Sequence, residues 1–162
     1  MTSYSKLILF DRSYLNIDKA GSKKIEFLYP IGLRWNCKRC GNCCKDPKDR
    51  ARRILLLNSD IERIISNVDI ETFYKEIFEE EPFIAEMLKR KGSCIFLNAK
   101  ECSIYDQRAL LCRMYPFYIE SKEGVFVIRY DKSCSGINIG EPLTLDFYKK
   151  ILVEGIRLRE AL

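Results

Sequence analysis

Residues 37–44 carry four cysteines in the pattern C-x2-C-x2-C-C, and this run constrains the fold more than any other feature of the sequence. A C-x2-C spacing lets a tight turn aim two thiolates at one metal ion, and Gly41 gives the backbone the freedom to approach the metal closely. The remaining four cysteines stand far apart. The full set of candidate metal ligands is Cys37, Cys40, Cys43, Cys44, Cys94, Cys102, Cys112 and Cys134.

The spacing bears on the kind of metal centre. A C-x2-C-x2-C run can deliver three thiolates to a [4Fe-4S] cluster, with the fourth ligand supplied from a distant part of the chain. Four thiolates equally suit a structural zinc ion. Cys44 directly follows Cys43, so their side chains tend to diverge and can serve two different centres. Eight thiolates divide naturally into two four-cysteine sites, although one site with spare cysteines also fits.

The chain contains no histidine. Its absence excludes Ser-His-Asp triads, Cys-His dyads, zinc-protease helices and two-histidine iron sites. Any chemistry therefore depends on cysteine, a metal, carboxylates, lysine or tyrosine. No glycine-rich nucleotide loop of the G-x-G-x-x-G kind is present.

Two alternatives to metal binding remain open. Cysteines pack well as small apolar residues, but four in one polar loop are badly placed for a core. Eight cysteines also permit 105 disulfide connectivities, yet an adjacent pair beside a C-x2-C run is awkward geometry for disulfides. We expect a cytoplasmic protein with no membrane contact, because no signal peptide or membrane helix is visible and the longest apolar runs are short. Thiols in that compartment are mostly reduced.

The net charge of +5 is concentrated around the cysteine run. Segment 34–53 holds eight Lys or Arg against Asp46 and Asp49. Such a patch can bind nucleic acid or an acidic protein. We favour a second interpretation, in which the cations stabilise the deprotonated thiolates and compensate the negative charge of the metal sites.

Length and pattern predict a single α+β domain spanning 1–162, with short strands and about four helices around cysteine-bearing loops. The metal-binding core is 35–140, preceded by a strand region 1–34 and followed by a helix in 144–162. Three further helices are predicted. The first runs from Ser59 to Ser66, with Glu62 in its capping box, and the second starts at Asp69 and is kinked or divided by Pro82. The third runs from Ser103 towards Cys112. A hairpin is expected around 121–124.

Several separated motifs occur in an order that resembles a known family. They are W-N-C-K-R-C-G-N-C-C at 35–44, S-D-I at 59–61, C-I-F-L at 94–97, C-S-I-Y at 102–105, C-R-M-Y-P-F at 112–117 and C-S-G at 134–136. Together they resemble the YkgJ-like cysteine-cluster (CxxCxxCC) family, which is described as zinc- or iron-chelating and often as iron-sulfur. One departure is Arg108–Ala109, where members usually have Arg-Pro. Proline would rigidify the turn before Cys112.

The resemblance implies metal chelation by the matching cysteines and no defined reaction. We expect a [4Fe-4S] cluster rather than zinc, in a structural or electron-transfer role. We expect the protein to bind metal without catalysing a reaction of its own. The alternative is a zinc-stabilised adaptor that binds nucleic acid or an acidic protein through 34–53. A remote alternative is a redox or transfer enzyme related to flagellin lysine N-methylases. Arg108 and Arg113 are candidates for hydrogen bonds to cluster sulfurs or for anion recognition, unless they pair with carboxylates such as Asp106.

Overall fold

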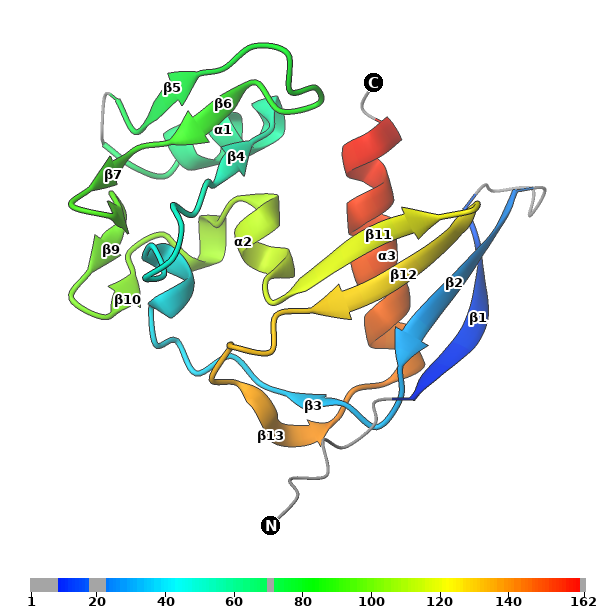
Figure 1. The fold of residues 1–162 in the computed structure, drawn as a ribbon. Coiled ribbons are helices and arrows are strands. Elements are labelled where there is room, and N and C mark those ends of the chain that lie inside the picture. Colours follow the sequence, from blue (N-terminus) through cyan, green and yellow to red (C-terminus); the bar gives the residue numbers. More distant parts are fainter. Residues whose placement is uncertain (1–8, 18–22, 70–71, 161–162) are drawn as a thin grey trace.

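The computed structural model describes residues 9–17, 23–69 and 72–160 (Figure 1). Parts of the predicted strand region (1–8 and 18–22), of the segment predicted to form the second helix (70–71) and of the final helix (161–162) lie outside the described residues. The described elements are β1 (Phe10–Asn16), β2 (Lys24–Pro30), β3 (Arg34–Trp35), the short 3-10 helix η1 (Asn42–Cys44), β4 (Leu55–Leu56), α1 (Asn58–Ile65), β5 (Tyr74–Glu76), β6 (Ala85–Met87), β7 (Lys89–Arg90), β8 (Ser93–Cys94), β9 (Leu97–Asn98), β10 (Glu101–Cys102), the 3-10 helix η2 (Tyr105–Gln107), α2 (Leu110–Met114), β11 (Phe117–Lys122), β12 (Val125–Tyr130), β13 (Ile137–Pro142) and α3 (Leu145–Glu160).

A four-stranded sheet with the order β1-β2-β12-β11 forms one half of the molecule. β1 pairs with β2 and β11 with β12 in antiparallel fashion, whereas β12 runs parallel to β2. The predicted hairpin is confirmed, and its two turn residues, Glu123 and Gly124, have the positive φ that a tight hairpin turn requires. α3 lies across one face of this sheet (Figure 1), where Tyr148 and Phe27 are fully buried in the first hydrophobic core.

A second hydrophobic core lies in the other half, beside α1 and the three-stranded sheet β4-β6-β5. Leu56, Ile64 and Phe73 are almost fully buried there, together with Cys44 and Cys94. Two hairpins, β7 with β8 and β9 with β10, extend this half (Figure 1). Cysteines therefore form part of the apolar packing of the second core, and none belongs to the buried residues of the first.

The helices confirm two predictions and overturn one. α1 and α3 occupy the segments predicted to be helical, but the helix predicted from Asp69 is wrong, since the segment forms β5 and β6. The reason is tertiary. Phe73 packs its ring 5.5 Å from that of Phe96, and β5 pairs with β6 through Tyr74 opposite Met87. A turn with cis Pro82 separates the strands, so the described part of the chain has three α-helices where about four were expected.

The helix predicted from Ser103 towards Cys112 divides into η2 and α2. Arg108 and Ala109 break it, because both have extended ψ angles, 145° and 154°. The φ of Ala109, −54°, lies within the range that proline fixes, and the ψ of Arg108 is one that a residue before proline adopts. The turn thus keeps a proline-compatible backbone although alanine replaces the usual proline. No helix in the described residues is long and apolar enough to cross a bilayer.

Asp60 joins the start of α1 to the segment that carries Cys112. Its carboxylate, 1% exposed, accepts hydrogen bonds from the backbone N–H of Leu57 at 3.1 Å and of Leu110 at 3.0 Å. Arg63 pairs with the same carboxylate at 2.8 Å and donates to the carbonyl of Arg108. The carboxylate that caps the start of α1, by accepting the backbone N–H of Leu57, is therefore that of Asp60. Glu62, which the sequence analysis placed in the capping box, is exposed.

We predict that Asp60→Ala lowers the free energy of unfolding by about 2 to 4 kcal/mol, because it leaves two backbone donors and Arg63 without their buried acceptor. Chemical denaturation of the variant and of the wild type under identical metal loading measures this difference. The matched variant Glu62→Ala removes an exposed carboxylate from the same helix and should change stability by less than about 0.5 kcal/mol. Equal effects of the two substitutions would contradict the assigned role of Asp60.

Candidate metal centre

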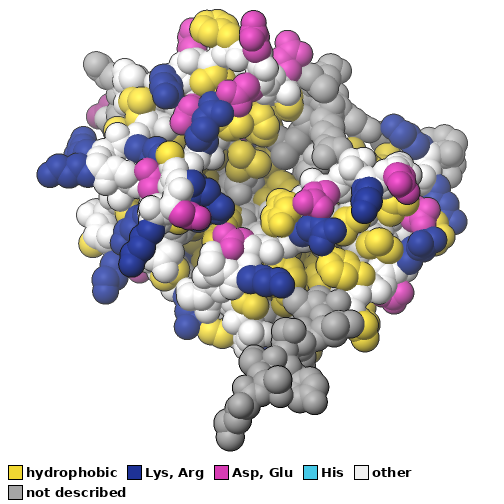
Figure 2. All heavy atoms as spheres, viewed as in Figure 1, with side chains coloured by type: hydrophobic (Ala, Val, Ile, Leu, Met, Phe, Trp, Pro, Cys, Tyr) yellow, Lys and Arg dark blue, Asp and Glu magenta, His cyan; other side chains and the backbone are white. Residues whose placement is uncertain are grey.

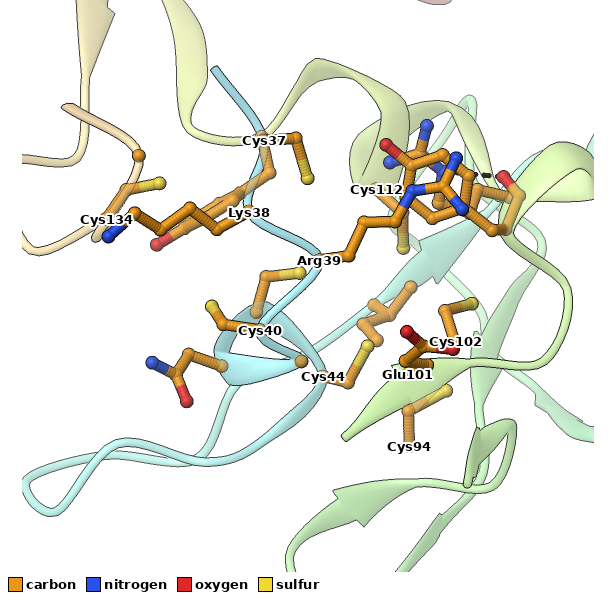
Figure 3. Close-up of a pocket in the computed structure, with 18 of the residues that line it drawn as sticks. Cys37, Lys38, Arg39, Cys40, Cys44, Cys94, Glu101, Cys102, Cys112 and Cys134 are labelled. Carbon is orange, nitrogen blue, oxygen red and sulfur yellow. Dashed lines mark hydrogen bonds between the residues drawn. The ribbon is translucent and has the colours of Figure 1, made fainter. Parts of the chain in front are cut away.

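All eight cysteines line one cavity of about 80 Å³ (Figure 3). They come from five segments, the loop 37–44 and the surroundings of Cys94, Cys102, Cys112 and Cys134. The cavity lies between the two cores, since Ile54 and Met87 of its wall belong to one half and Trp35 to the other. The structure therefore brings together every cysteine that the sequence predicted as a ligand. All eight are free thiols.

Five of these side chains form an inner cysteine group that packs with the second core, namely Cys43, Cys44, Cys94, Cys102 and Cys112. Figure 3 shows Cys44, Cys94 and Cys102 as neighbours at one side of the cavity. Cys44 lies within hydrogen-bond reach of the sulfur atoms of both Cys102 and Cys43. Thiols that contact each other in this way can share one metal centre once they are deprotonated.

The inner cysteine group contains thiols of opposite acidity. A hydrogen bond with Cys44, whose one S–H donates to only one sulfur at a time, lowers the pKa of Cys43 to about 6 and that of Cys102 to about 7, helped by the nearby charge of Arg108. The same contacts raise the pKa of Cys44 well above its ordinary value. Burial raises the pKa of Cys94 and of Cys112. Two of the five thiols are thus more acidic than an ordinary cysteine, and the other three are less acidic.

Three cysteines of the cavity do not pack with the second core and form an outer cysteine group, Cys37, Cys40 and Cys134. The Cys40 sulfur lies 3.4 Å from the hydroxyl oxygen of Ser135, and this contact lowers the pKa of Cys40. Cys37 contacts the hydroxyl of Tyr105, which raises the pKa of that tyrosine. The carbonyl of Gly136 accepts the backbone N–H of Asn36 at 3.1 Å and so holds the Cys134 loop beside the Cys37 loop.

Backbone N–H groups point at several of the sulfur atoms. Cys40 receives a hydrogen bond from the backbone of Asn42, Cys94 from Phe96 and Leu97, and Cys102 from Ile104. Three of these donors, Asn42, Phe96 and Ile104, lie two residues after the cysteine that accepts the hydrogen bond. Such hydrogen bonds favour the deprotonated thiolate that metal binding requires. The local backbone at these cysteines is therefore suited to metal ligation.

Two glycines permit the close approach of segments around the cavity. A Cβ on Gly136 would lie 2.2 Å from the carbonyl oxygen of Asn36, and one on Gly41 would lie 2.5 Å from that of Lys100. Gly41 also has a positive φ of 74°. Its closest neighbour is thus the chain at Lys100, a more specific reason for glycine than the close approach to the metal that the sequence suggested.

The indole N–H of Trp35 is buried in the cavity wall and has no acceptor among the described residues. A buried donor without a partner carries a free-energy cost of about 1 to 3 kcal/mol. Thiolate sulfur or the sulfide of a cluster is an acceptor of the right kind. Sequence analysis did not select Trp35, although its position two residues before Cys37 is a usable signal.

A stack of three side chains stands beside the outer cysteine group. The guanidinium carbons of Arg39 and Arg108 lie 3.9 and 3.6 Å from the ring centre of Tyr105. Two groups this close to one ring centre must occupy its opposite faces, so Tyr105 lies between two cations. Arg39 reaches across the cavity in Figure 3, and Arg108 donates to the carbonyl of Tyr105 at 2.7 Å. Both arginines line the cavity.

The two arginines selected from the sequence have different surroundings. Arg108 faces the cysteines and makes no ion pair with Asp106 or any other acid among the described residues. Arg113 lies outside the cavity lining and pairs with Glu154 of α3 at 3.6 Å. Arg52, which the sequence analysis did not select individually, lies over the ring of Tyr115 at 4.9 Å, and its charge also lowers the pKa of Cys43.

The eight thiols are of the right chemical type for a metal centre, but their sulfur atoms do not lie at coordination distances from a common point. Among the described residues no three cysteine or carboxylate side chains converge closely enough, as they stand, to hold one ion. Zinc–sulfur bonds of about 2.3 Å require the thiols to turn further into the cavity. The cavity has room for this, because one water needs only about 10 to 15 Å³ of comparable space and about 80 Å³ is open.

Comparisons with known proteins agree with this chemistry. The family CxxCxxCC, described as "Putative zinc- or iron-chelating domain", matches residues 36–135. An uncharacterised protein of Methanocaldococcus jannaschii is 31% identical over 140 residues, which cover 80% of this chain and 72% of that protein. No solved structure matches the chain significantly.

The pKa values of the inner cysteine group lead to a pH prediction for the metal-free protein. Thiolate absorbance in the ultraviolet should be present at pH 7 and should fall as the pH drops through about 6 to 7, where Cys102 and Cys43 take up protons. Cys44→Ala removes the hydrogen-bond donor and should move this titration towards the ordinary thiol pKa of about 8.5. Cys44→Ser keeps a donor and serves as the matched control. An unchanged curve for the alanine variant would exclude the proposed contact.

Proposed function

The chain belongs to the CxxCxxCC family of zinc- or iron-chelating domains, and on this basis we propose that it holds two four-cysteine centres in a structural or electron-transfer role. One centre uses the outer cysteine group together with Cys43; we call Cys37, Cys40, Cys43 and Cys134 the outer set and assign it a [4Fe-4S] cluster. The other centre uses the remaining four cysteines, Cys44, Cys94, Cys102 and Cys112, which we call the inner set. The supporting observation is that eight thiols from five segments line a single cavity.

The division into two sets follows from the surroundings of the sulfurs. Cys44, Cys94, Cys102 and Cys112 act on one another within the second core. The charge of Cys43 acts on Cys44, Cys94, Cys102 and Cys112, and it acts on Cys40 as well. Cys43 therefore lies between the two groups and can complete the outer set. The outer set then has the C-x2-C-x2-C spacing with one distant ligand, Cys134, which suits a cubane cluster.

The residues around the centres have defined tasks. Backbone N–H groups of Asn42, Phe96 and Ile104 donate to the sulfurs, and Trp35 offers a further donor. Arg108 and Arg39 offset the negative charge of the thiolates from one side of the cavity. A cluster bound here supplies single-electron transfer, with a potential that depends on these hydrogen bonds and on solvent exposure.

A zinc-stabilised domain is the second candidate, and the inner set favours it. Its four thiols, of which Cys44 and Cys94 are buried and Cys102 and Cys112 half-buried, match the four-cysteine ligand set of a structural zinc site, which contributes folding energy without redox chemistry. Both metals use the same ligand positions, so the geometry of the thiols does not separate them. Visible absorbance and acid-labile sulfide content distinguish an iron-sulfur cluster from zinc.

Metal analysis of protein purified without oxygen and without affinity metals tests the proposal. We expect iron with acid-labile sulfide and broad visible absorbance from the outer set, plus a second metal equivalent from the inner set. Cys134→Ser should remove the iron and the colour while leaving the inner metal, and Cys112→Ser should do the reverse. Loss of all metal from either variant would instead indicate one shared site, and metal-free protein with oxidised thiols would refute the proposal.

The single tryptophan of the chain provides an independent measurement. Because Trp35 lines the cavity beside the outer cysteine group, its fluorescence should be strongly quenched when an iron-sulfur cluster is bound and should recover when the cluster is removed by a chelator and an oxidant. Zinc loading should leave the intensity nearly unchanged. Cys134→Ser should fluoresce like the cluster-free protein, whereas Cys112→Ser should remain quenched if the outer cluster is present.

A further inference from the structure

Six exposed cations stand around the cysteine cavity without a carboxylate partner among the described residues. We name them the basic collar, and they are Lys45, Lys48, Arg50, Arg90, Lys91 and Lys100. Elsewhere in the described chain, cations do pair, for example Arg12 with Glu26, Arg53 with Glu80 and Arg129 with Glu120. Lys122, Lys132, Lys149 and Lys150 make no ion pair in the described chain either, but they lie on other segments, so the collar is the group of unpaired cations next to the cysteine loop.

Three separate segments build this collar, and tertiary contacts bring them together. The backbone N–H of Asp46 donates to the carbonyl of Gly92 at 2.8 Å, and Lys45 bridges to Ser93, so the turn after β7 lies against the cysteine loop. The carbonyl of Lys100 approaches Gly41 closely. Figure 2 shows Lys and Arg side chains along the outer margin of this half of the molecule.

Charge compensation of the thiolates does not account for these six residues. Lys38, Arg39 and Arg108 line the cavity and face the sulfurs. None of the collar residues lines it, and all six are exposed. On the same segments the carboxylate of Asp46 is engaged by Lys89 at 2.7 Å, which leaves Asp49 and Glu101 as exposed acids. The collar therefore presents a net positive surface to solvent.

The surroundings of the collar favour a protein over a nucleic acid as the partner. Single-stranded nucleic acid binds to basic grooves that offer aromatic rings for stacking, but both faces of Tyr105 are covered by arginines. The large exposed aromatic side chains lie on other segments, and they are Phe10, Tyr14, Phe78 and Tyr118. The helix in the cysteine loop, η1, has only three residues and cannot enter a groove as recognition helices do.

We propose that the basic collar docks an acidic protein surface beside the cysteine loop 37–44. The idea rests on the proposed function only for the purpose of docking, which is to bring the partner close to the metal centres of the cavity. Complementary charge of this kind mainly accelerates association and makes it sensitive to salt.

The test uses the metal-loaded full chain and a fluorescent, glutamate-rich peptide, with a single-stranded oligonucleotide of equal charge as the comparison. The collar variant is Lys45→Gln, Lys48→Gln, Arg50→Gln. The control variant, Lys122→Gln, Lys149→Gln, Lys150→Gln, removes the same charge from β11 and α3. We expect roughly tenfold weaker peptide binding at low salt for the collar variant, since three exposed charge contacts contribute about 0.5 kcal/mol each. The control should stay within about twofold of the wild type.

Three results would overturn the proposal: equal losses for both variants, no peptide binding at low salt, or collar-dependent binding that is tighter for the oligonucleotide than for the peptide. Metal content and the visible spectrum of each protein are recorded in parallel. A chain that binds the peptide through the collar but holds no metal would refute the proposed function alone. A metal-loaded chain indifferent to the collar would refute the docking surface alone.

Discussion

The convergence of five cysteine-bearing segments on one cavity is the constraint on which the rest of the structure depends. The cavity lies between two hydrophobic cores, and neither core supplies all of its wall. Side-chain contacts and close backbone approaches hold the segments in place. Asp60 ties α1 to the segment before Cys112, and Gly136 lets the Cys134 loop contact Asn36. Because thiols are small, their positions depend almost wholly on the backbone, so a shift in any one segment would move its cysteine away from the cavity.

Nearby hydrogen-bond donors and positive charges explain how eight cysteines can lie around one cavity in a protein that has no histidine. A cluster of sulfurs in a partly buried site is unfavourable as thiolates unless donors and cations lie nearby. Backbone N–H groups serve Cys40, Cys94 and Cys102, and Arg108 and Arg52 act on Cys43. The positive charge of segment 34–53 therefore has two uses. Some of its side chains face the sulfurs, and others, such as Lys48, face solvent.

The candidate site was easier to predict than the fold around it. Cysteine spacing is a local property, so the candidate ligands could be taken from the sequence, and the structure places all eight around one cavity. The helix expected from Asp69 was wrong because Phe73 and Tyr74 pack against Phe96 and pair with β6, contacts that no local pattern contains. Arg113 lies beside a cysteine in the sequence but turns towards Glu154, whereas Arg39 and Arg52, which were not selected individually, both act at the cavity or its cysteines.

The sequence by itself determined the chemistry of the donors, the absence of imidazole ligands, the placement of positive charge near the cysteine run and the helices α1 and α3. These properties depend on residue type and on neighbours a few positions away. Only the tertiary structure decided which thiols lie together, and that Trp35 lines their cavity with an N–H that has no acceptor in the described part of the chain. It also decided that Arg90, Lys91 and Lys100 join the basic surface. The physical reason is that metal ligands and surface charges act through distance in space, and that distance is set by the packing of the two cores on either side of the cavity.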